Sequence, residues 1–146
     1  MLPNAPPDRW TIPDACRRIE REFDLPYDIY NQDWEYTLSD PSLTDVFIAK
    51  YDIRDPDTDY RFALAAIAID SADQALSNGT LADSTLNRLR QILTDDSEVL
   101  MYLIHYWCIF GATNDEEYFP ISPFFRSVWN AITGDTIPLT MPPRCG

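Results

Sequence analysis

The feature that most constrains the fold of this chain is an apolar run in its last third. Over residues 99–110 every side chain except that of His105 is apolar or aromatic. A helix built from this run has no polar stripe to turn toward water, so it has to be covered by other helices. Ser97 and the acids around it suit a helix start, and Gly111 suits the left-handed residue after a last turn. The run predicts a core helix over about 97–110, with a buried strand as the competing interpretation.

Apolar residues recur at steps of three and four through most of the remaining chain, which is typical of amphipathic helices. The spacing predicts helices over about 12–23, 27–38, 41–51, 57–78, 83–94 and 122–134. The segment 46–49 is also compatible with a strand, but the chain offers it no obvious partner strand. We therefore expect an all-α fold, a compact bundle of about six to seven helices around the central apolar helix.

Capping residues define the expected ends of these helices. The expected N-caps are Thr11, Asp40, Asp57 or Thr58, and Asp83 or Ser84. Pro13, Pro41 and Pro123 fall in first turns, where the missing N–H group does no harm. Gly79 and Gly134 are expected to stop the helices that precede them.

The two ends of the chain are expected to lie outside the helices. Residues 1–10 carry three of the 12 prolines, which predicts an extended arm pinned to the body by Trp10. Residues 135–146 carry three more prolines and predict a loose tail. A chain of 146 residues has the usual length of one domain, so we expect a single domain over 1–146.

Charge restricts the kinds of partner that this chain can bind. It has 24 acidic against 11 basic residues, a net charge of −13. Such a protein repels phosphate backbones and anionic lipids, so we expect no direct contact with nucleic acid or membranes and favour a basic protein partner. The apolar run is shorter than a membrane span of roughly 18 residues. The first residues do not resemble a signal peptide and the three scattered cysteines form no disulfide pattern, which predicts a cytoplasmic location.

Two segments carry residue types that are found in metal or catalytic sites, but neither contains the complete set of residues that such a site needs. Segment 55–59 alternates aspartates as a calcium loop does, but Tyr60 replaces the required glycine and Ala66 the bidentate glutamate. We expect a turn and a helix cap there. His105 and Cys108 lie three residues apart, but further zinc ligands are lacking and an apolar helix is a poor setting for a nucleophilic thiol. A buried histidine bonded to a tyrosine or a carbonyl is the simpler interpretation.

The chain is poorly equipped for catalysis. It has one lysine, one histidine and four separated glycines, so it can build neither a rich acid–base site nor a phosphate-binding loop. We expect no cofactor, no metal and no enzymatic activity. A small helical enzyme or ligand-binding domain that uses His105 or Cys108 is the alternative.

Acidic residues are concentrated between Asp24 and Asp59. This segment has ten acids against Lys50 and Arg54, with large aromatic residues between them. Aromatic side chains supply much of the binding energy at protein interfaces, and acids around them suit a basic protein. The candidate partner face consists of Asp28, Tyr30, Asp33, Trp34, Glu35, Asp52, Asp55, Asp57 and Asp59. The alternative is that the aromatic residues form core and the acids merely cover it.

Acidity without catalytic equipment favours a non-catalytic inhibitor. In this general character the chain resembles small acidic bacterial immunity proteins. The resemblance implies that it neutralises a cognate toxin by covering a basic surface or active site. A second hypothesis is a DNA mimic that inhibits a nuclease or a DNA-binding protein, which requires carboxylates spaced like phosphates along one face.

Overall fold

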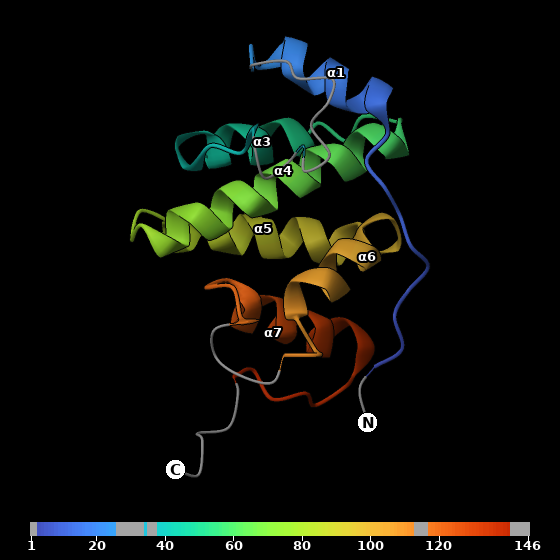
Figure 1. Cartoon of the computed structure of the whole chain (residues 1–146), viewed down its shortest axis with the longest axis vertical. Coiled ribbons are helices and arrows are strands. Elements are labelled where there is room, and N and C mark those ends of the chain that lie inside the picture. Colours follow the sequence, from blue (N-terminus) through green and yellow to red (C-terminus); the bar gives the residue numbers. More distant parts are fainter. Residues whose placement is uncertain (1–2, 26–33, 35–37, 113–116, 141–146) are drawn as a thin grey trace.

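The computed structural model describes residues 3–25, 34, 38–112 and 117–140. Over these residues the regular secondary structure is helical and includes no strand, which confirms the predicted all-α fold (Figure 1). The elements are α1 (Pro13–Glu22), the 3₁₀ helix η1 (Pro41–Leu43), α3 (Thr44–Tyr51), α4 (Thr58–Ser77), α5 (Asp83–Asp95), α6 (Ser97–Cys108) and α7 (Ser122–Thr133). Segment 46–49 lies inside α3 and is therefore helical. The predicted helix over 27–38 falls outside the described residues, apart from Trp34 and Leu38.

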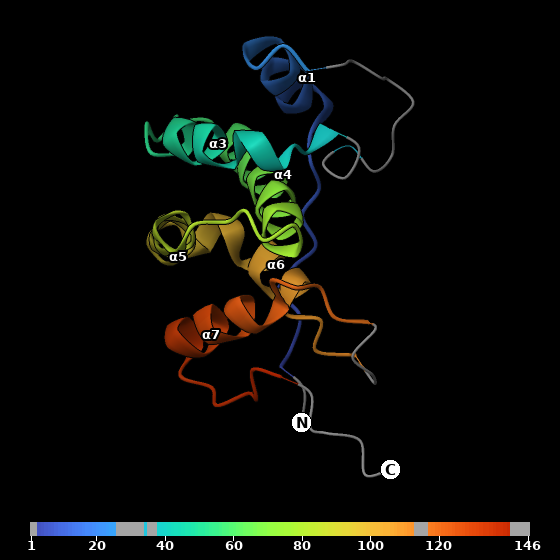
Figure 2. The same cartoon turned by 90° about the vertical axis from the view of Figure 1, so that its left-hand side faces the viewer.

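The helices are stacked in layers. α1 lies at one end, followed by α3 with α4, then α5 with α6, and α7 lies at the other end (Figure 1). Helix contacts join each layer to the next, through α1 with α4, α4 with α6, and α6 with α7. The described part of the N-terminal arm runs along one side of this stack, from the α7 end up to α1 (Figures 1 and 2).

The most completely buried helix is α4. Thirteen of its 20 residues are buried, including Leu64, Ile67 and Ile69, so it packs against neighbours on more than one face. Six alanines of this helix are among the buried residues, and their small side chains allow close packing. In α6, by contrast, Leu100, Ile104 and other residues of one face are buried while Tyr106 is 49% exposed. An exposed position is compatible with tyrosine because its hydroxyl group can form hydrogen bonds with water.

Several predicted helix ends are confirmed. The side chain of Asp57 accepts hydrogen bonds from the N–H groups of Asp59 and Tyr60 at the start of α4. Asp40 caps η1 by accepting a bond from Ser42 N–H. Gly79 and Gly134 have φ angles of 73° and 82°, the left-handed conformation that glycine adopts without strain.

Other predicted caps are wrong. The N-cap residues of α1, α5 and α6 are Ile12, Ala82 and Asp96, and none of them makes a side-chain capping bond. The left-handed residue after α6 is Ile109 (φ 47°) rather than Gly111. At the end of α6, the physical reason for this difference is a cap that another helix supplies.

That cap is the guanidinium group of Arg126 in α7. Arg126 is buried and donates hydrogen bonds to the carbonyls of Cys108 and Ile109, at 2.8 and 2.9 Å. These carbonyls lie at the end of α6, where no intrahelical partner exists. A third bond, 2.9 Å long, reaches the carbonyl of Pro138. Arg126 therefore joins α6, α7 and the segment after α7.

Both chain ends differ from expectation. Trp10 does not pin the arm, because its side chain is 70% exposed. Arg9 does so instead, by pairing with Asp59 at 3.3 Å. The tail is bound to the body at least as far as Pro138, since Asn130 also exchanges hydrogen bonds with the backbone of Ile137 at 2.8 and 3.0 Å. Residues 141–146 lie outside the described part.

Among the described residues no helix combines the length and the apolar character that crossing a lipid bilayer requires.

Candidate functional site

The last part of the acidic segment, residues 52–59, lies at the corner between α3 and α4. The chain leaves α3 at Tyr51 and turns back through Arg54, whose φ of 59° is left-handed. Asp57 then starts α4, and its own N–H group donates to the Asp55 side chain at 2.9 Å. The aspartates at 55–59 thus form the turn and the helix cap that the sequence predicted. No cluster of possible metal ligands is found among the described residues.

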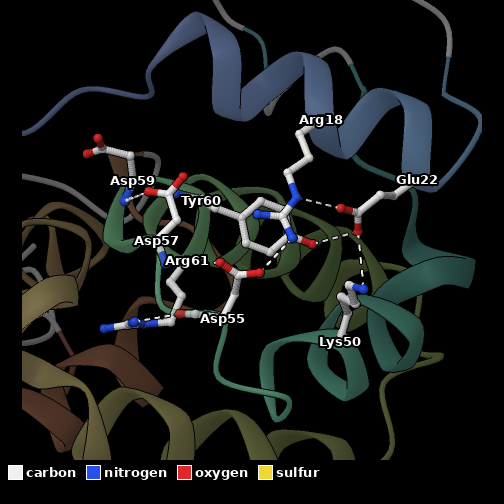
Figure 3. A network of polar contacts seen from close by, with 8 residues as sticks. All are labelled: Arg18, Glu22, Lys50, Asp55, Asp57, Asp59, Tyr60 and Arg61. Atoms are coloured by element: carbon white, nitrogen blue, oxygen red, sulfur yellow. Dashed lines mark hydrogen bonds and ion pairs between the residues drawn. The ribbon is translucent and has the colours of Figure 1, made fainter.

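Asp55 belongs to a polar network between α1, α3 and α4 (Figure 3). Arg18 donates to Asp55 at 2.6 Å and to Glu22 at 2.7 Å, and its guanidinium lies 3.7 Å from the centre of the Tyr60 ring. The other Glu22 oxygen accepts from Tyr60 at 2.8 Å and lies 3.3 Å from the Lys50 nitrogen. The hydrogen bond from Arg18 lowers the pKa of Asp55, so this carboxylate stays charged at neutral pH.

A second network is centred on Asp96, at the junction of α5 and α6. Its carboxylate accepts a hydrogen bond from Tyr51 and another from Arg61 at 2.9 Å. Arg54 lies 4.0 Å from the same oxygen. Burial alone would raise the pKa of Asp96, but these donors outweigh it and the pKa is lowered. The network attaches α3 and α4 to the α5–α6 junction.

The other aspartates of the predicted face that the structure describes also have intramolecular partners. Asp52 pairs with Arg88 of α5 at 3.1 Å, and Asp59 pairs with Arg9 of the arm at 3.3 Å. Their side chains are each 50% exposed, against 22% for that of Asp55. The structure thus brings Asp52, Asp55, Asp57 and Asp59 to one corner, where they also hold neighbouring elements together.

The aromatic part of the predicted face is corrected at Trp34. This side chain is buried, and its indole N–H donates to Glu20 at 2.8 Å. Its amphipathic indole thus serves the core, so the expectation that its ring faces a partner is wrong. Asp28, Tyr30, Asp33 and Glu35 lie outside the described residues.

Basic side chains are mostly engaged within the molecule. Those that lie within 4.0 Å of a carboxylate are Arg9, Arg17, Arg18, Lys50, Arg54, Arg61 and Arg88. Arg126 is buried on carbonyls, and Arg90 donates to Ser127 at 3.1 Å. Asp8, Asp24, Asp83 and Glu98 are exposed and form no ion pair within 4.0 Å in the part of the chain that the structure describes. The outward charge is therefore dominated by carboxylates.

His105 lies beside a shallow hollow at the end of α6. The hollow has a volume of about 300 Å³ and is lined by Pro3, His105, Tyr106, Ile109, Phe110 and Gly111. The His105 ring makes edge contacts with the rings of Phe110 and Trp129, at centroid distances of 5.4 and 5.5 Å. Burial lowers the pKa of His105, against a hydrogen bond to the backbone of Pro3 that raises it. The hydrogen bond to backbone matches the simpler sequence interpretation, but His105 is half-buried rather than buried.

Cys108 is not an activated nucleophile in this setting. Its side chain is fully buried, and burial raises its pKa to about 12 despite the positive charge of Arg126. A thiol with that pKa is protonated at neutral pH and lacks the exposed, electropositive environment of reactive cysteines.

Sequence reasoning missed one exposed feature, the short strip Asp8, Trp10, Ile12 and Asp14. All four residues are exposed, and Trp10 and Ile12 are exposed by 70% and 40%. The signal was present, because Asp8, Trp10 and Ile12 are spaced by two residues just before Asp14 in the first turn of α1. This period is typical of an extended segment with one solvent-facing side.

Comparison of the chain with models of known protein families, with curated proteins and with solved structures finds no match.

Proposed function

We propose that this protein is a non-catalytic inhibitor that binds a basic protein and neutralises it. A bacterial immunity protein that covers the basic surface or active site of a cognate toxin is the kind of inhibitor that we favour. The observation that carries the proposal is the engagement of nearly all described basic side chains in contacts within the chain. Because the chain carries a net charge of −13 and its described basic side chains are mostly paired, the charges that remain unpaired are mostly carboxylates.

Physical reasons connect this charge distribution to inhibition. An excess of outward carboxylates attracts a cationic partner over a distance of about one Debye length, and it discourages partners of the same sign. Charge complementarity mainly raises the association rate and the specificity, while a few desolvated contacts set the dissociation rate. A toxin that acts on nucleic acid or another anion needs a basic site, which such a protein can cover.

The test has two stages. Affinity capture from the native host identifies a candidate partner, and stopped-flow mixing of the purified pair then measures the association rate against salt. Between about 0.05 and 0.5 M NaCl we expect the rate to fall by roughly tenfold or more, because screening removes the steering. An association rate that does not change with salt would refute the proposal. Competition by duplex DNA would assign the partner's nucleic-acid site as the covered surface.

A further inference from the structure

Trp10 is the one tryptophan of the described structure whose side chain lies mostly in solvent. It is 70% exposed, whereas Trp34, Trp107 and Trp129 are exposed by 5 to 6%. Two residues along, Ile12 is 40% exposed, and Asp8 and Asp14 flank the pair. We call these four residues, Asp8, Trp10, Ile12 and Asp14, the arm strip.

The arm strip is held in place from its inner side. Arg9 pairs with Asp59 at 3.3 Å and lies over the Phe62 ring, 5.2 Å from its centre. Thr11, the next residue but one, is half-buried, and Ile12 has extended dihedral angles of −89° and 133°. In an extended segment alternate side chains point to opposite sides, so Arg9 and Thr11 face the body while Trp10 and Ile12 face outward. These contacts attach the arm to the body on the side opposite the apolar pair.

The apolar pair of the arm strip is flanked by two exposed carboxylates. Asp8 is exposed, and the Asp14 side chain is 93% exposed with Arg17 at 3.6 Å, a distance at which an exposed pair contributes little. Of the cations near the strip, Arg9 binds Asp59, Arg18 binds Asp55, and Arg17 lies beside Asp14. A partner thus meets an indole ring and an aliphatic side chain between carboxylates.

This combination suits arginine. A guanidinium group stacks on an indole face and at the same time pairs with a carboxylate, which lysine does less well. Tryptophan is also the residue type most enriched among those that dominate interface binding energies. Trp10 is 70% exposed in the described structure, so its ring is accessible to another molecule.

We propose that the arm strip anchors the basic partner. Trp10 and Ile12 enter an apolar depression that is bordered by arginine side chains, and Asp8 and Asp14 pair with those arginines. This assignment rests on the proposed function and adds to it the position and the chemistry of the contact.

A peptide probe tests the assignment without knowledge of the partner. Hexa-arginine amide is titrated into the full chain at low salt, and accessibility of Trp10 is followed through acrylamide quenching of tryptophan emission. We expect the peptide to protect Trp10 from quenching and to bind several-fold more tightly than hexa-lysine amide. The other three described tryptophans are buried and should contribute little to the quenched signal.

Matched variants distinguish peptide binding at the arm strip from peptide binding through the overall negative charge of the protein. Affinity for hexa-arginine, followed by calorimetry, is expected to fall about tenfold in Trp10→Ala and several-fold in Asp8→Asn. Two variants at other places serve as controls. Leu139→Ala removes another exposed apolar side chain. Asp83→Asn removes another exposed charge, which follows the end of α4, a helix of 20 residues and about 30 Å, whereas the arm strip lies near its start. Both controls are expected to bind within about twofold of the unchanged protein. Because these side chains are exposed, melting temperatures should stay within about 2 °C.

The outcomes distinguish the two proposals. Equal binding of hexa-arginine to Trp10→Ala and to the unchanged protein would overturn the arm strip assignment and leave the inhibitor proposal intact. Failure of the unchanged protein to bind the peptide at low salt would also overturn the assignment. The inhibitor proposal depends on the salt dependence of the captured partner, which the peptide experiment does not measure.

Discussion

Asp96 is expected to contribute more to stability than any neighbouring acid. Its carboxylate accepts hydrogen bonds from Tyr51 and Arg61, and the Asp96 and Arg61 side chains are only 13% and 16% exposed. Asp96→Asn preserves the shape of the side chain and removes its charge. Asp95→Asn is the matched control, because Asp95 is 45% exposed and lies 3.5 Å from Arg54.

The size of the effect follows from the contacts. A hydrogen bond to a charged group contributes about 1 kcal/mol more than one between neutral groups, and two such bonds are weakened in Asp96→Asn. Arg61 is then left largely buried without its carboxylate, which adds about 1 kcal/mol. The total is about 2–3 kcal/mol, or about 5–10 °C in melting temperature for a chain of this size. For Asp95→Asn we expect less than about 0.5 kcal/mol.

Urea unfolding followed by circular dichroism measures both variants. The m-value should stay unchanged, so that a shift in midpoint reports stability. The pH dependence provides a second criterion. The folded-state pKa of Asp96 lies below its ordinary value of 3.8, so its contribution is complete above that pH and is lost as the pH falls through the lowered pKa. Equal destabilisation by Asp96→Asn and Asp95→Asn at pH 7 would refute this account of the network.

Two further predictions concern local structure. Gly134→Ala should cost about 1 kcal/mol of stability, because Gly134 has a φ of 82°. Gly111→Ala should change stability by less than about 0.5 kcal/mol, because the added Cβ would meet open space and the φ of Gly111 is not positive. Thermal melts compare the two variants directly, and the opposite order would contradict the assigned helix ends. Trp34→Phe should cost about 1–3 kcal/mol, because it removes the donor to the buried Glu20 carboxylate. Trp10→Phe, at an exposed position, should change the free energy of unfolding by less than about 0.5 kcal/mol, and similar losses in both variants would place Trp34 outside the core.

The local signals in the chain determined the class of fold and many of the helix ends. Apolar spacing is a property of neighbouring residues, so it predicted the helices from α1 to α7 with bounds close to those observed. The caps at Asp40 and Asp57 and the stop at Gly134 also depend on residues within one turn. The turn formed by 55–59 was predictable for the same reason.

Contacts between distant residues were decided only by the tertiary structure. Arg18 and Asp55 are 37 positions apart, and Arg9 and Asp59 are 50 apart, so no local pattern reveals that these aspartates are paired. The same limit explains why Trp34 is core and Trp10 is exposed, since both are tryptophans in acidic surroundings. The end of α6 is capped by Arg126 from α7 rather than by its own glycine. Sequence spacing determined which segments are helical, and the packing of those helices decided which charges are paired within the molecule and which side chains stay exposed.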